Sequence, residues 1–376
     1  MNMAGRFAVK FILWLELISF FLQYTFSFAK EFTSVFDLCT TLIDLFLTTQ
    51  IAFKDKEDKW KLKVIGWMSL VLLFASVINI SSFGIGSILT IVRFLLFMLL
   101  VTKIEIKKIY VPFMLLLFIV QLVLMRFVDL SLYNTNTVGL VYMTLGVYIL
   151  LLINPGNKRS WLVSLLITAY IEYQIWLSDS RTCMAAFMLF VVGLMSSKYV
   201  LRSKLILVLI MCALTIGSMI YVRTYVYLWE NNLVDQDIVK ESMDATGKRV
   251  FSGRERIWQE CLQLLSEKPL TGTGSKIKLK SFVEVNLHNS MLNFFVIYGY
   301  VVGVLVMYMI IRTVLDLQPY MRNRRVRNSV VAFMSFLLVA FSETNLVVLS
   351  FTSMLCLMNA YTEKKKIERK PAYDNL

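Results

Sequence analysis

Long apolar runs, separated by short polar connections, fill most of the chain. Each run is apolar without the alternation of a barrel strand, so it predicts a helix. A helix needs about 20 apolar residues to cross a membrane. The pattern therefore predicts an all-α, polytopic membrane protein of about twelve transmembrane helices. The predicted spans are 7–28, 33–53, 64–80, 84–102, 109–128, 137–153, 161–177, 183–197, 205–222, 290–311, 328–341 and 346–361.

Lysine and arginine collect in every second connection between these spans. Cytoplasmic loops of membrane proteins carry an excess of both residues. We therefore expect both termini in the cytoplasm and the intervening connections on the outer side of the membrane. The short outer connections hold only Lys30 and Arg181 as basic residues. The basic connections lie at 6–10, 54–63, 103–108, 158–159, 198–204, 312–327 and 364–370.

The composition agrees with this topology and indicates which kinds of molecule the protein is expected to bind. The chain is 58% hydrophobic, whereas a soluble domain is nearer 45–50% apolar. The net charge of +14 follows from the cytoplasmic connections, so membrane lipids are expected as partners and nucleic acid is not. The five cysteines have neither metal-binding spacing nor a disulfide framework. No metal and no cofactor is predicted.

One outer connection is long. Residues 223–289 join the ninth and tenth predicted helices. This segment is too short for a large independent domain, and we expect it to fold as a few helices that cap the membrane part. The chain is thus expected to form a single transmembrane domain, residues 1–376, with 223–289 as an extracytoplasmic subdomain.

Two arginines stand out on the predicted outer side. Arg181 lies in the turn Ser178-Asp179-Ser180-Arg181-Thr182 and either reaches lipid headgroups or binds an anion. Ser252 and Glu255 have capping-box spacing, which predicts a helix that ends at Glu267 and carries Arg254 in its first turn. A helix N-terminus with an arginine can bind an oxyanion; the alternative is an ordinary capped surface helix.

The predicted helix after Ser252 is amphipathic. Helical spacing places Arg254 on the apolar face, which should pack on the membrane part. Arg256 falls on the solvated side. The apolar positions that share the face of Arg254 are Trp258, Cys261, Leu262 and Leu265.

His288 is the only histidine in the sequence, and Asn289 follows it where the chain is predicted to re-enter the membrane. A single histidine excludes a metal centre built on histidines. It can act alone as a general base or acid; otherwise it is an interfacial residue without chemistry.

Other charged residues are harder to assign. Asp235 and Asp237 match the DxD pattern of metal-dependent glycosyltransferases, but those enzymes use cytosolic nucleotide sugars and this segment is expected outside. Charges inside spans cost about 2.5–3.5 kcal/mol on insertion. Such charges line a cavity or pair with one another. They are Glu16, Arg93, Arg126 and Glu172.

The outer features, taken in order, resemble the O-antigen polymerase and ligase family, the Wzy and WaaL proteins. Residues 178–181 resemble the family's S-x-SR signature. Residues 252–274 resemble its GR-x-x-x-W … PL-x-G-x-G segment, and residues 288–303 resemble its HN-x-x-L segment with the glycines that follow it, here Gly299 and Gly303. The ordered set is more specific than any one of its pieces.

Three further positions bear on the resemblance. Asn136 opens a span, as in the family, and Glu343 matches an acidic position in the last outer turn. Thr182 departs from the pattern, because the family usually has glycine there. The resemblance covers residues 136–357 and leaves the first five spans without a signature.

The resemblance implies a bacterial glycosyltransferase that takes a glycan from a polyprenyl diphosphate carrier at the outer face of the cytoplasmic membrane. Arginine can neutralise the departing diphosphate, so Arg181 and Arg254 are expected to bind it. His288 is then the catalytic base for the attacking sugar hydroxyl, which implies a metal-independent, inverting transfer. The expected supporting residues are Asp179, Ser180, Arg256, Asn289 and Glu343.

Several functions remain open at this stage. The first is a polymerase of capsule, exopolysaccharide or O-antigen that uses undecaprenyl-diphosphate-linked oligosaccharide, with a flippase and a chain-length regulator as candidate partners. The second is an O-antigen ligase that hands the glycan to lipid A core. The third is a glycolipid transporter or flippase, which would predict internal repeats, and none is visible.

Overall fold

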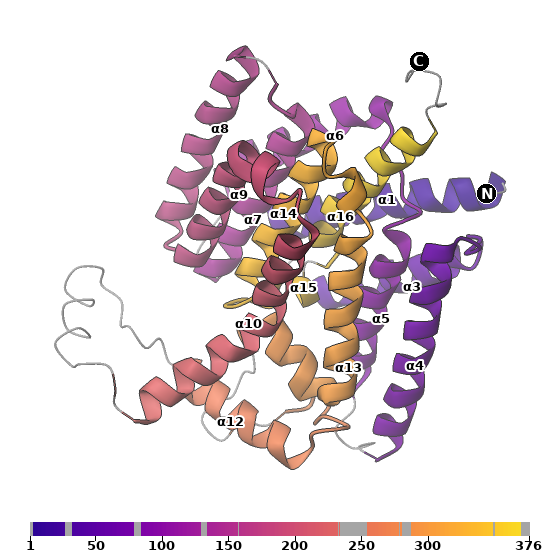
Figure 1. The fold of residues 1–376 in the computed structure, drawn as a ribbon, viewed down its shortest axis with the longest axis vertical. Helices are drawn as coiled ribbons and strands as arrows, with labels where there is room; N and C mark the ends of the chain where they lie inside the picture. Colours follow the sequence, from indigo (N-terminus) through magenta and orange to yellow (C-terminus); the bar gives the residue numbers. More distant parts are fainter. Residues whose placement is uncertain are drawn as a thin grey trace.

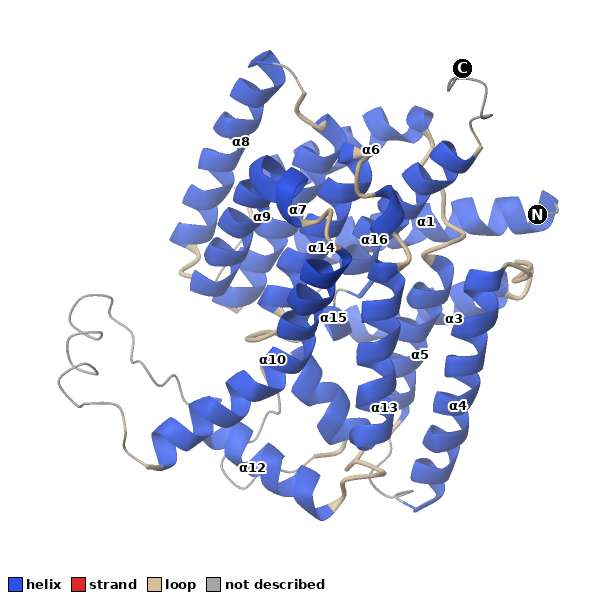
Figure 2. Ribbon diagram, in the orientation of Figure 1, coloured by secondary structure: helices blue, strands red, loops and turns tan. Residues whose placement is uncertain are grey.

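The structure is a computed structural model of the chain. It describes residues 3–26, 32–78, 84–128, 134–156, 158–231, 233, 254–277, 279, 287–348 and 350–369. These residues form helices and connecting loops, and the described part contains no strand (Figure 2). The predicted all-α class is confirmed.

A helix lies at each predicted span. The helices, drawn in Figure 1, are α1 (Met3–Thr25), α3 (Thr33–Thr48), α4 (Lys56–Ile78), α5 (Ile85–Leu100), η1 (Lys108–Tyr110), α6 (Val111–Leu124), α7 (Thr135–Ile153), α8 (Lys158–Leu177), α9 (Arg181–Val200), α10 (Lys204–Glu230), α12 (Arg254–Glu267), α13 (Ser290–Leu315), η3 (Gln318–Tyr320), α14 (Arg324–Val339), α15 (Asn345–Val348) and α16 (Ser350–Glu368).

Six helical segments are long and apolar enough to cross a membrane, counted over the described residues. They are Met3–Thr25, Lys56–Ile78, Thr135–Ile153, Arg181–Lys198, Lys204–Glu230 and Ser290–Tyr320. Large apolar side chains on several of these helices are exposed, for example Leu73 on α4 and Leu209 on α10. Such exposure suits a lipid-facing surface. The protein is thus an integral membrane protein, while a total of twelve spans stays a prediction.

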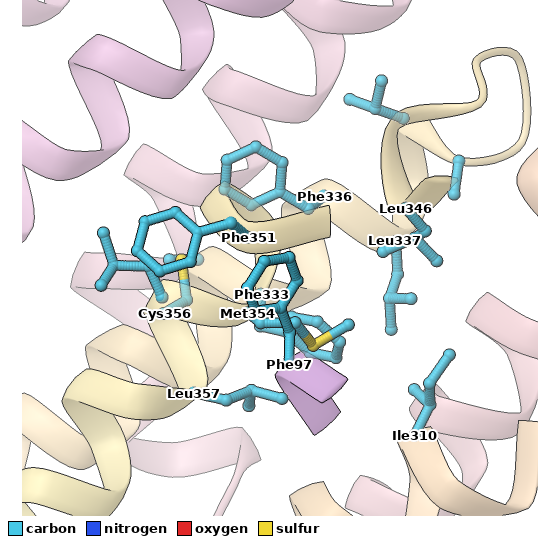
Figure 3. Packing of buried hydrophobic residues seen from close by; sticks show 14 of the residues in the cluster. Phe97, Ile310, Phe333, Phe336, Leu337, Leu346, Phe351, Met354, Cys356 and Leu357 are labelled. Carbon is cyan, nitrogen blue, oxygen red and sulfur yellow. The ribbon is translucent and has the colours of Figure 1, made fainter. Parts of the chain in front are cut away.

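Part of the buried core lies between α5, α14 and α16. Figure 3 shows aromatic and aliphatic side chains from these helices packed together. The Phe97 and Phe351 rings have centroids 5.4 Å apart, and Phe333 is fully buried beside them. This core holds α14 in place, and the turn that carries Glu343 follows directly from α14.

Ion pairs join the ends of helices on the predicted cytoplasmic side. Lys103 contacts Asp55 and Asp58, with its Nζ 2.8 Å and 2.6 Å from their carboxylates. Lys364 pairs with Glu57. The start of α1 and the end of α16 lie on the side of the molecule away from α12 (Figure 1).

α10 is longer than the predicted span. The apolar run ends near residue 222, but the helix continues to Glu230. In this last part Val226 is buried, and the ring of Tyr225 contacts the ring of Trp258 in α12. Packing against α12 therefore extends the helix into the segment that the sequence assigned to the outer loop.

α13 is not the uninterrupted span that the sequence predicts. Gly299 has φ +82° and breaks the helix, so the backbone nearby needs other hydrogen-bond partners. The amides of Thr273 and Gly274 donate to the carbonyls of Val296 and Ile297, at 2.8 Å and 3.0 Å. Residues 269–274 are thus docked on the break in α13.

Glycine is required on both sides of this contact. A Cβ added at Gly299 would clash with the carbonyl of Leu270, and one at Gly272 would clash with the carbonyl of Ile297. Gly272 also has φ +67°, a conformation that other residues rarely adopt. The two glycines therefore fix how the segment after α12 meets α13.

Candidate active site

α12 is held against the membrane helices by its tryptophan. Trp258 is fully buried; its Nε1 donates to the Leu287 carbonyl at 2.8 Å, and its ring meets those of Tyr221 and Tyr225 on α10. As predicted, Trp258 and the other apolar positions of this face are buried, Leu262 partly, and the helix ends at Glu267. The predicted cap Ser252 lies outside the described residues.

Arg254, the first residue of α12, meets Glu343 from the turn after α14. The Arg254 Nη2 is 3.0 Å from the Glu343 Oε1, and the two side chains are 19% and 12% exposed. A partly buried pair of this kind holds the start of α12 against the end of α14. Arg256, by contrast, is exposed, as predicted.

His288 lies on the other side of the same carboxylate. Its Nδ1 is 3.8 Å from the Glu343 Oε2, and its side chain is 20% exposed. The residue has φ +47°, which is uncommon for a residue other than glycine and recurs at functional sites. Glu343 therefore links the guanidinium of Arg254 to the imidazole of His288.

Asn289 is fully buried and caps α13. Its side chain accepts a hydrogen bond from the Leu292 amide at 2.8 Å. It also donates to the Ser218 hydroxyl of α10 and to the Phe341 carbonyl, both at 2.9 Å. These bonds fix the backbone that carries His288, so Asn289 has a structural role beside the cluster.

The turn that carries Glu343 is fastened to the first residue of α13. The Ser290 amide donates to the Ala340 carbonyl at 2.9 Å, and the Ser290 hydroxyl donates to the Glu343 carbonyl at 2.8 Å. The side chain of Asn345 donates in turn to the Phe336 carbonyl at 2.8 Å. The roles of Ser290 and Asn345 could not be predicted from the sequence, because the segments that they join are distant along the chain.

The turn before α9 is tight and buried. Ser178 and Ser180 are both buried, and a Cβ added at Gly139 of α7 would clash with the Ser180 side chain. Asp179 is exposed and has φ +56°. Thr182 lies inside α9, so the left-handed position in this turn belongs to Asp179, away from the site of the family's glycine.

Arg181 is not brought into the Arg254–Glu343–His288 cluster. It is exposed at the first position of α9, and its guanidinium has no hydrogen bond or ion pair to any described residue. Its neighbour Cys183 lies within electrostatic range of Glu343. The Ser178–Arg181 turn thus reaches the region of the cluster without contacting it.

Other reactive groups near the cluster have little chemistry to offer. Burial raises the pKa of the Cys261 thiol of α12 to about 12, so it stays protonated at neutral pH and is a poor nucleophile. Within the described ranges, no three histidine, cysteine or acidic side chains are grouped so that they could hold a metal ion. Asp235 and Asp237 lie outside the described residues.

The four charged residues predicted within spans lie in three different environments. Glu16 and Arg93 pair, with 2.9 Å between the carboxylate and the guanidinium, as one of the two sequence interpretations expected. Arg126 is exposed beyond the end of α6. Both carboxylate oxygens of Glu172 are buried and have no hydrogen-bond partner among the described residues.

Part of the chain is similar to a known protein family. Residues 162–307 match the family model described as O-antigen ligase, a range that includes Arg181, Arg254 and His288. No curated protein and no solved structure matches the chain. The matched domain supports a glycosyltransferase-like membrane enzyme that uses lipid-linked oligosaccharide. It confirms the resemblance found in the sequence: residues 162–307 are similar to the O-antigen polymerase and ligase family.

Proposed function

We propose that the chain is a polysaccharide polymerase. It joins repeat units carried on undecaprenyl diphosphate into capsular, exopolysaccharide or O-antigen chains at the outer face of the bacterial cytoplasmic membrane. The observation that carries the proposal is the meeting of Arg254, Glu343 and His288, from three separate segments, around one carboxylate. A cation, a carboxylate and an imidazole are the groups that a metal-independent glycosyl transfer needs.

Arg254 and Arg181 neutralise the departing diphosphate in this mechanism. Each arginine is the first described residue of its helix, where the unpaired amides and the helix dipole favour an anion. Arg254 contacts Glu343 through Nη2, which leaves its other donors for a phosphate oxygen. Arg181 is exposed, and binding the second phosphate draws it toward the cluster.

His288 takes the proton from the attacking sugar hydroxyl. Glu343 lies beside Nδ1, so it favours the proton on that nitrogen and leaves Nε2 as the base, the arrangement in which a carboxylate orients a catalytic imidazole. Attack by the hydroxyl and departure of the diphosphate in one displacement inverts the anomeric carbon. The carboxylate also stabilises the imidazolium that forms.

An assay with purified protein and a synthetic undecaprenyl-diphosphate oligosaccharide tests the proposal. We expect a ladder of high-molecular-weight product, formed equally with and without a chelator. Loss of the ladder on chelation would contradict the arginine mechanism and would indicate that a metal ion, with Asp235 and Asp237 as candidate ligands, is required. Absence of any product with every repeat unit offered would contradict the polymerase.

A ligase is the second candidate, because the matched family model is described as O-antigen ligase. Donor chemistry at the cluster is the same for both reactions, and only the acceptor differs. The assay therefore includes a lipid A core acceptor without a carrier. Transfer to this acceptor in preference to a second carrier-linked unit would establish the ligase.

A further inference from the structure

A second cluster of charged side chains lies among the amino-terminal helices, outside residues 162–307. Glu16 comes from α1, Asp37 and Asp44 from α3, and Arg93 from α5. The Arg93 Nη2 is 2.9 Å from the Glu16 Oε2, and Nη1 pairs with Asp37. None of these residues belongs to the proposed mechanism.

The charges of this cluster do not balance. Three carboxyl groups share one guanidinium, and Arg93 is the cation that acts on both Glu16 and Asp44. The Asp37 side chain is 28% exposed, so water can compensate it in part. Glu16 and Asp44 are 2% and 0% exposed, and a buried unpaired carboxylate is very costly.

Neighbouring elements supply no further positive charge among the residues that the structure describes. Within the described residues, α6 contributes Gln121, which donates to the Phe20 carbonyl at 3.4 Å. α1 adds Gln23, which donates to Asp37 at 3.2 Å. Both side chains are neutral amides, and each uses its donor elsewhere than on Asp44.

The carboxyl groups of Glu16 and Asp44 interact with one another. The two side chains lie within hydrogen-bond range. The Glu16 Oε1 and both Asp44 oxygens are nevertheless buried, and no described residue donates a hydrogen bond to them. Facing carboxylates repel unless a positive charge bridges them, as in acid pairs that share one proton.

We propose that Glu16 and Asp44 form a binding site for one small monovalent cation, a proton or a sodium ion, inside the α1–α3–α5 bundle. The bound cation joins α1 to α3 and offsets the carboxylate that Arg93 leaves unpaired. The site is independent of glycan chemistry at the outer cluster.

Carbodiimide labelling of the purified full chain tests this site, because dicyclohexylcarbodiimide reacts with protonated carboxyl groups in apolar surroundings. In choline buffer without sodium, peptide mass spectrometry should locate an adduct on Asp44 or Glu16, and the adduct should decline as pH rises. Added sodium chloride, compared with choline chloride, distinguishes the occupants. If sodium chloride protects Glu16 and Asp44 from the carbodiimide, the bound cation is sodium. If sodium chloride leaves the labelling unchanged, the bound cation is a proton.

Matched variants complete the design. Asp44→Asn should fold, since its amide can donate to Glu16, and should lose the adduct at that position. Asp37, ion-paired and partly exposed, should remain unlabelled. Glu172, a carboxyl group without a hydrogen-bond partner among the described residues, serves as an internal reference for access of the reagent.

Thermal unfolding gives a second measurement. A cation bound only by the folded chain stabilises it by mass action. The wild-type melting temperature should therefore fall with rising pH or rise with sodium, and Asp44→Asn should lose that dependence. Two results together would overturn the proposal. They are the absence of a carbodiimide adduct on Glu16 and Asp44, and a melting temperature that depends on pH and sodium in the same way in the wild type and in Asp44→Asn.

Discussion

The carboxylate of Glu343 contacts two different groups, the guanidinium of Arg254 and the imidazole of His288. Arg254 is permanently charged and favours an ionised partner, whereas in the proposed mechanism His288 takes a proton from the attacking sugar hydroxyl. With the arginine at 3.0 Å and the imidazole at 3.8 Å, the closer contact of the Glu343 carboxylate is with Arg254. Binding of a diphosphate to Arg254 would loosen that contact and leave more of the carboxylate to His288.

Replacement of His288 tests the base directly. We expect His288→Ala to lower the rate of polymer formation by about 10²–10⁴-fold, the usual contribution of a general base, and to leave membrane insertion intact. The measurement is the rate of ladder formation with the synthetic carrier-linked substrate. His288→Gln, which keeps a polar side chain without a base, should be equally impaired, and normal polymer from either variant would show that His288 is not the base.

The arginines are tested by lysine, which keeps the charge but loses the planar fork. Arg181→Lys and Arg254→Lys should each reduce kcat/KM for the diphosphate-linked donor by at least about tenfold, as loss of a bidentate phosphate contact predicts. Arg256→Lys is the matched control, because Arg256 is exposed on the same helix as Arg254. Full activity of Arg181→Lys would mean that Arg181 only contacts lipid headgroups.

At the residue scale, the sequence predicted the parts of the site better than their arrangement. The face of α12 that carries Arg254 follows from helical spacing, and the structure confirms it. The left-handed backbone at Asp179 and His288 could not be predicted, because it depends on contacts with distant segments. The hydrogen bond from Asn289 to Ser218 is of the same kind, since the two residues are far apart in sequence.

At the scale of elements, the broken helix α13 is the largest difference from the sequence prediction. Hydropathy over residues 290–311 predicts one span, and the glycines at 272 and 299 give no sign that they touch. The break is possible because residues 269–274 supply hydrogen-bond partners to the freed backbone, including a 2.7 Å bond from the Tyr300 amide to the Pro269 carbonyl. This contact also sets the path of the chain from α12 to α13.

Substitution of Gly299 tests whether this contact supports the fold. Gly299→Ala introduces a side chain at φ +82° and against the Leu270 carbonyl, so it should destabilise the protein by more than about 1 kcal/mol. The measurement is the melting temperature of the purified protein in detergent. Activity should fall as well, because α12 would lose its fixed position beside Glu343.

Gly66→Ala is the control for that substitution. Gly66 lies in α4, where an added Cβ meets nothing within 4 Å. Alanine in a helix is favoured over glycine by about 0.5–1 kcal/mol, so this variant should unfold at the same temperature or slightly higher. Equal melting temperatures for Gly299→Ala and the wild type would show that the docked segment does not stabilise α13.

At the scale of the whole molecule, charge and hydropathy were enough to locate the helices. A helix lies at each predicted span, since long apolar runs in lipid have little alternative. What they could not reveal is which helices meet, and the pairing of Glu16 with Arg93 across α1 and α5 is an example. The helix contacts form two polar clusters in separate parts of the fold. The Arg254–Glu343–His288 cluster lies at the start of α12, and the Glu16–Asp44–Arg93 cluster lies among α1, α3 and α5.

The predicted orientation has a direct test in single cysteines on opposite ends of the helices. Arg256 on α12 and Lys107 before η1 are both exposed, and the positive-inside tendency places them on opposite sides of the membrane. In a chain with the exposed Cys39 replaced by serine, a membrane-impermeant maleimide should label Arg256→Cys in intact cells. Lys107→Cys should react only after the membrane is opened.

This labelling also bears on the reaction, because a carrier-linked glycan is polymerised on the side where its sugars lie. Arg254 lies two residues from position 256 in the same helix, so the label at 256 reports the side of the Arg254–Glu343–His288 cluster. Labelling of Lys107→Cys, and not of Arg256→Cys, in intact cells would place the cluster in the cytoplasm. Cytosolic nucleotide sugars would then be available to the cluster. Asp235 and Asp237 would again be candidates for the metal-binding DxD pattern of a nucleotide-sugar glycosyltransferase.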